Sequence, residues 1–149
     1  MSERYVRGPV AGARGAFLEL EQADWEATIG EVRRLFLEAR DYARDHAGPG
    51  RIIFVSAAAA ARPIAGAALE GVAGAFLTTA AQVAAVELAE KGITVNVILP
   101  ALEPDEQAVE AVRNFLLSDE ARGVTGAVIA ADGGFSITKS SDASPLLGS

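Results

Sequence analysis

A chain of 149 residues and 15.4 kDa is long enough to bury one hydrophobic core, so we expect a single domain. The formal charge of −7 and the pI near 4.7 exclude the basic surface that nucleic acids and anionic membranes attract. The chain has no Cys, which excludes disulfides and thiolate metal sites, and its first residues lack the apolar core of a signal peptide. We therefore expect a cytoplasmic protein.

The first predicted helix follows a start that is rich in Gly and Arg. Asp24 is its candidate N-cap, because apolar residues then recur at a spacing of three to four. The recurring residues are Ile29, Val32, Leu35, Phe36, Ala39 and Tyr42. We expect this helix to end at the Gly-Pro-Gly sequence 48–50. Residues 51–55 then form a short apolar run that is typical of a parallel strand covered on both faces.

A second helix is predicted from about residues 63–66 to Lys91, where Gly92 ends it before a strand at 93–98. Its uncharged stretch, 71–86, is shorter than the roughly 20 residues that span a bilayer, and we interpret it as a buried helix.

Pro104 and Asp105 open a third predicted helix, and residues 126–131 form the last predicted strand. Strands that alternate with helices predict an α/β fold, a three-layer sandwich with a small parallel sheet of about three to four strands. We expect this domain to span residues 1–135 and to be followed by a flexible tail, 136–149.

Four segments, in order, carry a resemblance to a known family. They are Phe17-Leu18-Glu19 with Asp24-Trp25-Glu26, the strand and Ser at 50–56, the segment 85–96, and 115–120 followed by Val124-Thr125-Gly126 and Asp132-Gly133-Gly134. From about Tyr5 to Phe135 the chain resembles the short-chain dehydrogenase/reductase family, especially its oxoacyl reductase branch. The resemblance implies a Rossmann-like fold that is truncated at its N-terminus, without the family's first three strands.

The resemblance also places the family's catalytic positions on this sequence. The Tyr position falls on Glu70 and the Lys position on Gly74; the Ser position falls on Ala57, with Ser56 adjacent. The supporting Asn position falls on either Glu31 or Val32, and neither residue has the side-chain amide of Asn. A carboxylate is ionised near neutrality and cannot donate the proton that the family's Tyr provides, and Gly offers no cation. We therefore predict that this chain carries no catalytic residue.

The cofactor site is predicted to be absent as well. The family binds its dinucleotide at the first βα turn, which belongs to the missing strands. Gly8, Gly12 and Gly15 are spaced like a phosphate loop, yet they do not lead directly into a helix, and they fit equally the loop after the family's fourth strand. We expect NAD(P) only on a catalytic partner. Between Pro100 and Phe115, a short acidic segment stands where the family has a substrate lid.

Two titratable residues need separate consideration. We interpret His46 as a solvated residue at the helix C-terminus, and no second His or carboxylate cluster predicts a metal site. Glu70 has three alternatives: it is exposed, it is paired with a partner's cation, or it is a replacement base. Arg62 is the only charge near the loop 57–61 that we expect to pair with it.

In the family, the helices that correspond to those beginning near Ala23 and Ala67 form a four-helix interface with a neighbouring subunit. The second helix is apolar on nearly all sides, which a small sheet alone cannot bury. The predicted interface residues are Val72, Phe76, Ala80, Val83 and Ala84 on the second helix, with Leu35 and Ala39 on the first.

We therefore expect a non-catalytic subunit of a heteromeric short-chain dehydrogenase, paired with a full-length relative that acts on hydroxyacyl or oxoacyl substrates. Two alternatives remain: a homo-oligomeric scaffold or binding protein without an oxidoreductase partner, and an enzyme with a replaced centre that uses Glu70 and Ser56.

Overall fold

The computed structural model describes residues 4–9 and 12–137, in which strands and helices alternate. The elements are β1 (Arg4–Pro9), α1 (Gln22–Asp45), β2 (Gly50–Val55), α2 (Ala68–Leu88), β3 (Ile93–Pro100), α3 (Glu106–Leu117) and β4 (Val128–Ala131), with short 3-10 turns at Phe17–Glu19, Ala58–Ala60, Ala89–Lys91 and Asp119–Ala121. The four strands are all parallel and lie in the order β1-β2-β3-β4. The predicted α/β class and small parallel sheet are confirmed.

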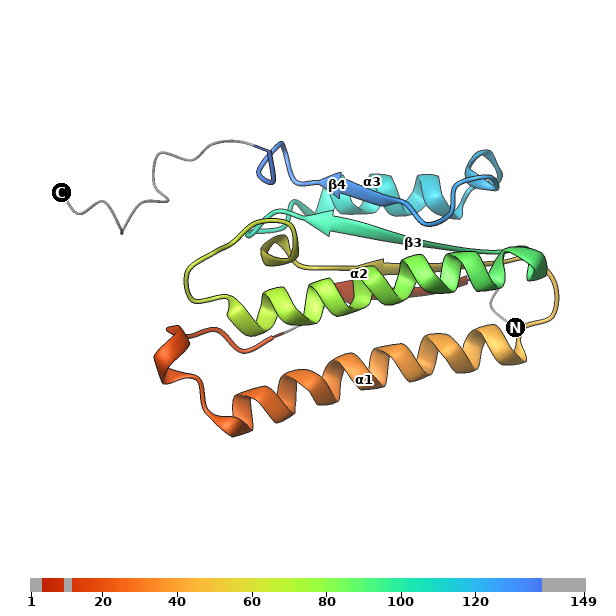
Figure 1. Ribbon diagram of the computed structural model, residues 1–149. Coiled ribbons are helices and arrows are strands. Elements are labelled where there is room, and N and C mark those ends of the chain that lie inside the picture. Colours follow the sequence, from red (N-terminus) through yellow and green to blue (C-terminus); the bar gives the residue numbers. More distant parts are fainter. Residues whose placement is uncertain (1–3, 10–11, 138–149) are drawn as a thin grey trace.

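The sheet is the middle layer of three, with α1 and α2 on one face and α3 on the other (Figure 1). Successive residues of β2 face opposite layers, as the pleat requires: Ile52 and Phe54 join the cluster under α1 and α2, whereas Ile53 and Val55 join the cluster under α3. Because both faces are covered, successive residues of β2 and β3 are buried, rather than only every second one.

The helix ends follow the expected chemistry with one correction. Asp24 is not the N-cap of α1; Glu21 is, and Asp24 returns a bond from position N3, its carboxylate accepting from the Glu21 amide at 3.0 Å. This reciprocal arrangement is a capping box. Asp24 therefore caps the helix from position N3, and the helix begins three residues earlier than predicted. The third helix opens at Asp105 as predicted, where the structure shows this residue to be the N-cap of α3, and Gly92 ends the α2 segment at φ +72°.

Helix α2 begins a few residues later than predicted, at Ala68, and it is less buried than expected. With the turn that follows it, the helical segment Ala68–Lys91 has 24 residues, and its most apolar window has a mean hydropathy of 1.5 with only 28% of it buried. By length and composition this segment could cross a membrane, since the apolar window extends beyond the uncharged stretch 71–86. Here Leu77, Ala81 and Ala85 pack into the core under the helix, and the opposite side stays exposed.

The chain beyond β4 turns sharply at Asp132, whose carboxylate accepts from the Gly134 and Ser136 amides at 2.9 and 2.8 Å. Bonds from Ser136 hold the pKa of Asp132 below its usual value. The Ile137 amide also bonds back to Gly134, so no break in structure occurs at the predicted boundary after Phe135. The rest of the predicted tail, 138–149, lies outside the described residues.

Candidate functional site

The degenerate catalytic positions converge at the carboxyl ends of β2 and β3, the edge at which parallel α/β sheets bind ligands. A pocket of about 270 Å³ lies there. Its lining residues are Arg14, Ser56, Ala57, Ala58, Glu70, Pro100, Ala101, Leu102, Glu103 and Pro104. Only residues 101–105 connect β3 to α3, as expected for a chain without the lid.

The loop after β2 packs so closely against Gly74 that no longer side chain fits at this position. A Cβ at Gly74 would lie 2.8 Å from Ser56 Oγ and 3.0 Å from the Ala57 amide nitrogen. The Ser56 hydroxyl is fully buried and donates to the Gly74 carbonyl at 3.0 Å, and it also contacts Thr78 Oγ1 at 3.3 Å. The loop after β2 therefore packs directly on α2, and the hydrogen bond from Ser56 links the two.

Glu70 is buried, with 8% of the residue exposed, and it is held by a cation of its own chain. Arg14 donates through Nε to Oε2 at 2.5 Å and through Nη2 to Oε1 at 3.2 Å. This fork of bonds and the carboxylate charge raise the pKa of Arg14 above its usual value.

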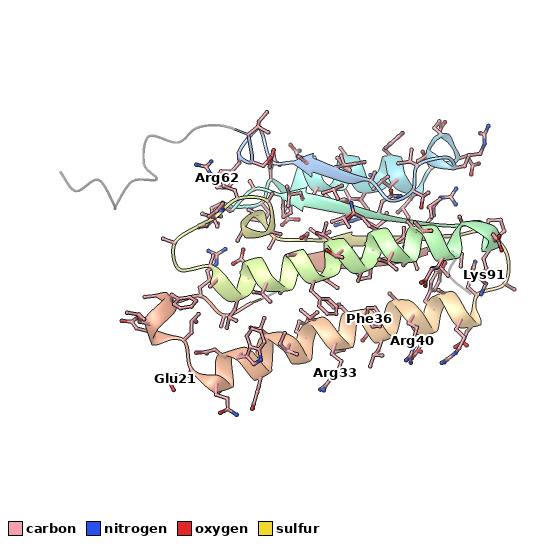
Figure 2. The ribbon with its side chains drawn as sticks, in the orientation of Figure 1. Glu21, Arg33, Phe36, Arg40, Arg62 and Lys91 are labelled. Atoms are coloured by element: carbon pink, nitrogen blue, oxygen red, sulfur yellow. The ribbon has the colours of Figure 1, made fainter. Side chains whose placement is uncertain are left out.

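The expected partner Arg62 was wrong, and so was the exposed alternative for Glu70. Arg62 instead donates to the Phe135 carbonyl at 2.9 Å and lies 5.0 Å from that ring's centroid, beside the C-terminal turn (Figure 2). Arg14 and Glu70 are 56 positions apart, and only the tertiary fold brings the segment after β1 to the start of α2.

The remaining positions, those of the family's Asn and of the glycines, have structural roles in this chain. Glu31 pairs with Arg34 on the surface of α1, and Val32 is 1% exposed in the core. The glycines also differ from a phosphate loop: Gly8 lies within β1, Gly15 donates its amide to the Gly66 carbonyl at 2.9 Å, and the next α-helix begins only at Gln22. Their arrangement fits a loop after a strand.

His46 is buried rather than solvated, which corrects the prediction. Its ring stacks on Tyr42 at a centroid distance of 4.9 Å, and its Nε2 lies 2.9 Å from the Pro49 carbonyl oxygen. The turn at 47–49 folds back over the helix end, which removes the ring from solvent. Across the described ranges 4–9 and 12–137, no cluster of three His, Asp or Glu could hold a metal ion.

The predicted interface residues of α2 lie on an exposed apolar face. Val72, Phe76 and Val83 are 40%, 46% and 52% exposed. Phe36 of α1 projects toward α2 and meets Phe76 edge to face at 6.1 Å, so the two helices share one apolar surface (Figure 2). We call the surface formed by Phe36, Val72, Phe76, Ala80, Val83 and Ala84 the helix-pair face.

The two predicted interface residues of α1 are largely buried. Leu35 and Ala39 are only 3% and 7% exposed, and both belong to the core of this chain. One residue further along, Phe36 reaches the surface, because each residue turns about 100° around a helix. The seam with α2 is thus rotated by about one position from the predicted one.

A groove of about 650 Å³ lies between the C-terminal halves of α1 and α2. Small side chains form its walls, namely Ala39, Ala43, Ala80 and Ala84, and its floor reaches Ile52, Phe54 and Val95 of the sheet. A volume of this size and an apolar lining are typical of surfaces that receive a ligand or a partner.

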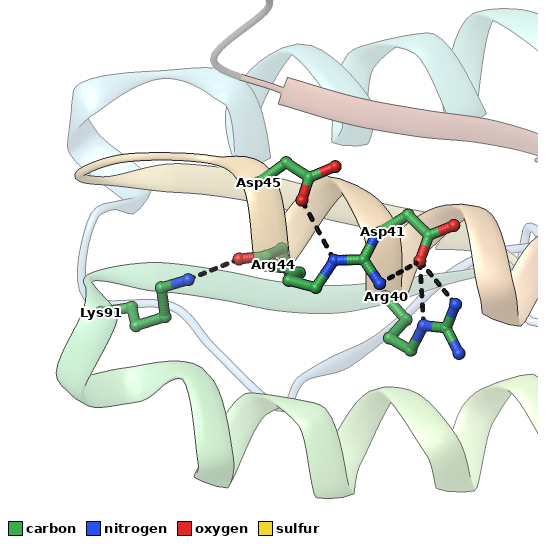
Figure 3. Close-up of polar contacts among 6 residues, drawn as sticks. Arg40, Asp41, Arg44, Asp45 and Lys91 are labelled. Carbon is green, nitrogen blue, oxygen red and sulfur yellow. Dashed lines mark hydrogen bonds and ion pairs between the residues drawn. The ribbon is translucent and has the colours of Figure 1, made fainter.

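The cations at the rim of this groove already have partners within the chain (Figure 3). Arg40 and Arg44 both contact Asp41 Oδ1, at 2.6 and 3.3 Å, and Lys91 donates to the Ala43 carbonyl at 2.6 Å. Bonding to Arg40 holds the pKa of Asp41 below its usual value. With its rim cations engaged, the groove favours an apolar occupant over an anionic one.

Comparisons with known proteins agree with this architecture. Residues 8–104 match the family described as Enoyl-(Acyl carrier protein) reductase, whereas a search of curated proteins finds no significant match. The chain belongs to the short-chain dehydrogenase/reductase family.

Solved structures of this family resemble the chain closely. A short-chain dehydrogenase/reductase from Serratia marcescens is 27% identical with a TM-score of 0.82, and the match covers 90% of this chain and 66% of that one. The reductase LugOII, titled as catalysing keto-reduction, is 26% identical with a TM-score of 0.83, covering 91% and 61%. Acetoin dehydrogenase YohF from Salmonella typhimurium is 24% identical with a TM-score of 0.82, covering 91% and 65%, and shows the fold alone. The chain thus spans less than two thirds of each of these structures.

Proposed function

We propose that this chain is the non-catalytic subunit of a heteromeric short-chain dehydrogenase/reductase. The observation that carries the proposal is the helix-pair face, an exposed apolar surface on a chain whose catalytic positions hold Ala57, Glu70 and Gly74. Such a surface on a soluble protein marks an interaction site, and these residues supply neither the proton donor nor the cation for hydride-transfer chemistry. The partner is a full-length relative that carries NAD(P) and a complete centre.

The substrate class of the complex follows from what the chain is similar to. The matched family is described as Enoyl-(Acyl carrier protein) reductase, and LugOII is described as a reductase that catalyses keto-reduction. The first description names an acyl group and the second a ketone, and from the two together we propose an oxoacyl or hydroxyacyl substrate, bound and turned over by the partner. We place this complex in the cytoplasm.

Self-association is the second candidate, since the helix-pair face is exposed whichever chain covers it. A homo-oligomer would be a scaffold or binding protein and would contain no other dehydrogenase. The composition of the purified complex separates the two candidates.

The isolated chain is expected not to bind NAD(H) or NADP(H). The glycines after β1 do not lead into a helix N-terminus, so no array of backbone amides is aimed at a pyrophosphate. Isothermal titration of the purified chain with each nucleotide checks this expectation. Micromolar binding by the chain alone would overturn it.

Glu70→Gln and Ser56→Ala are expected to leave the activity of any complex within about threefold of wild type. Glu70 is occupied by Arg14, and the Ser56 hydroxyl is bonded to α2, so neither is available to a substrate. Steady-state kinetics on the assembled complex measures the effect. A loss of about a hundredfold, equal to about 2.7 kcal/mol of barrier, would instead support a replaced active centre.

A further inference from the structure

The Glu70 carboxylate is oriented to bind a planar cation. Both carboxylate oxygens accept from one guanidinium, at 2.5 and 3.2 Å, and the Glu70 side chain is only 11% exposed. Two parallel bonds match the fork of a guanidinium and cannot be reproduced by an ammonium group. The site therefore discriminates between cations by their shape as well as by their charge.

The charges lining the pocket point to the same ligand. Glu103 lines the pocket beside Glu70, and its charge also contributes to the raised pKa of Arg14. Without Arg14, the lining would hold two carboxylates and no cation. Such a site attracts a cation and repels the phosphates and carboxylates of anionic ligands.

The present occupant belongs to a short segment that we call the strap, residues 12–15. It contacts both long helices at their N-terminal ends: the Ala13 amide donates to Thr28 Oγ1 of α1 at 3.2 Å, and Arg14 reaches Glu70 of α2. Gly12 lies directly on α2, since a Cβ there would be 2.5 Å from the Glu70 Cα. Figure 1 shows this segment beside the start of α2. The strap thus forms one side of the pocket.

We propose that the pocket at Glu70 and Glu103 is a guanidinium-binding site, which the chain fills with its own Arg14. The tethered Arg14 has a high effective concentration, so it excludes free guanidinium ligands and keeps the strap closed. An arginine side chain of a docked partner peptide is the ligand that would displace it. This inference does not depend on the subunit role.

Chemical rescue of Arg14→Ala in the full chain tests the site. Removing the guanidinium frees the strap, and exchange of the Gly15 amide, which is bonded to the Gly66 carbonyl, should become at least about tenfold faster. Ethylguanidinium at about 20 mM should restore most of the protection, because the ligand stabilises the closed state that it binds. Methylammonium at the same concentration should not, and neither ligand should act on Arg14→Ala combined with Glu70→Gln.

Equal rescue by the two cations, or no rescue by ethylguanidinium, would overturn the proposal. Trypsin cleavage after Arg14 gives a second measurement in a chain that keeps this residue. Glu70→Gln should accelerate that cleavage at least about tenfold relative to cleavage after Arg122, because the bond becomes accessible when the strap opens. Glu106→Gln, on α3, is the control and should leave the ratio unchanged. An unchanged ratio in Glu70→Gln would show that the pair does not hold the strap.

Discussion

Ala80→Arg and Ala84→Arg are each expected to abolish association of the chain with its proposed partner while leaving its own fold intact. Both alanines line the groove of the helix-pair face and are partly exposed in the chain alone, so an arginine there can extend into solvent. In a complex the same long charged side chain would have to be accommodated and desolvated in an apolar contact between helices, at a cost of several kcal/mol, roughly the stability of a whole assembly. Size-exclusion chromatography with light scattering measures the loss as a smaller mass.

The matched control for these variants is Ala111→Arg, an equal substitution at an exposed position of α3 on the other face of the sheet. Glu106→Arg, in the first turn of the same helix, serves the same purpose. Both controls should keep the wild-type mass. If Ala80→Arg and Ala84→Arg also keep it, the helix-pair face is not the interface.

Gly74→Lys restores the family's cation at its expected position, yet it is expected to destabilise the chain by about 2–3 kcal/mol, the usual cost of overpacking a core. The added Cβ would meet Ser56 Oγ and the backbone nitrogen of Ala57 at 3.0 Å or less. The midpoint of thermal unfolding should fall by about 6–10 °C. Combined with Glu70→Tyr, it should produce no reductase activity, because the loop after β2 already occupies the space.

Gly30→Ala provides the opposite result within the same chain. Gly30 lies inside α1, and a Cβ there would meet nothing within 4 Å. Replacing a helical glycine without a clash should stabilise the chain by about 0.5–1 kcal/mol. If Gly74→Lys proves as stable as wild type under the same conditions, the loop after β2 can move to admit a side chain, and the close packing around Gly74 is no argument for the proposed loss of catalysis.

The sequence could predict the layers because local signals and global pattern agree. The apolar runs of β2 and β3, the break at Gly92 and the cap at Asp105 each reflect chemistry within a few residues. The resemblance also aligned Glu70, Gly74 and Ala57 with the family's catalytic positions, and the structure brings them together at one edge.

The errors came from contacts between distant segments or from helix rotation. The partner of Glu70 is Arg14, far away in sequence, and no local pattern signals it. His46 is buried by a turn that follows it, and Leu35 faces inward where periodicity alone left the seam uncertain by one position. The spacing of apolar residues predicts the apolar side of a helix. It does not predict which of those residues pack against the sheet and which stay exposed.

The central claim, a non-catalytic subunit bound to a complete dehydrogenase, is tested most directly by affinity purification of the tagged chain from its native host. The wild-type chain should retain one full-length short-chain dehydrogenase at a fixed ratio, and this complex should reduce an oxoacyl substrate with NAD(P)H. The Ala84→Arg chain, purified in parallel, should lose that protein. If the wild-type chain instead elutes alone or only with copies of itself, it is not a subunit of a dehydrogenase.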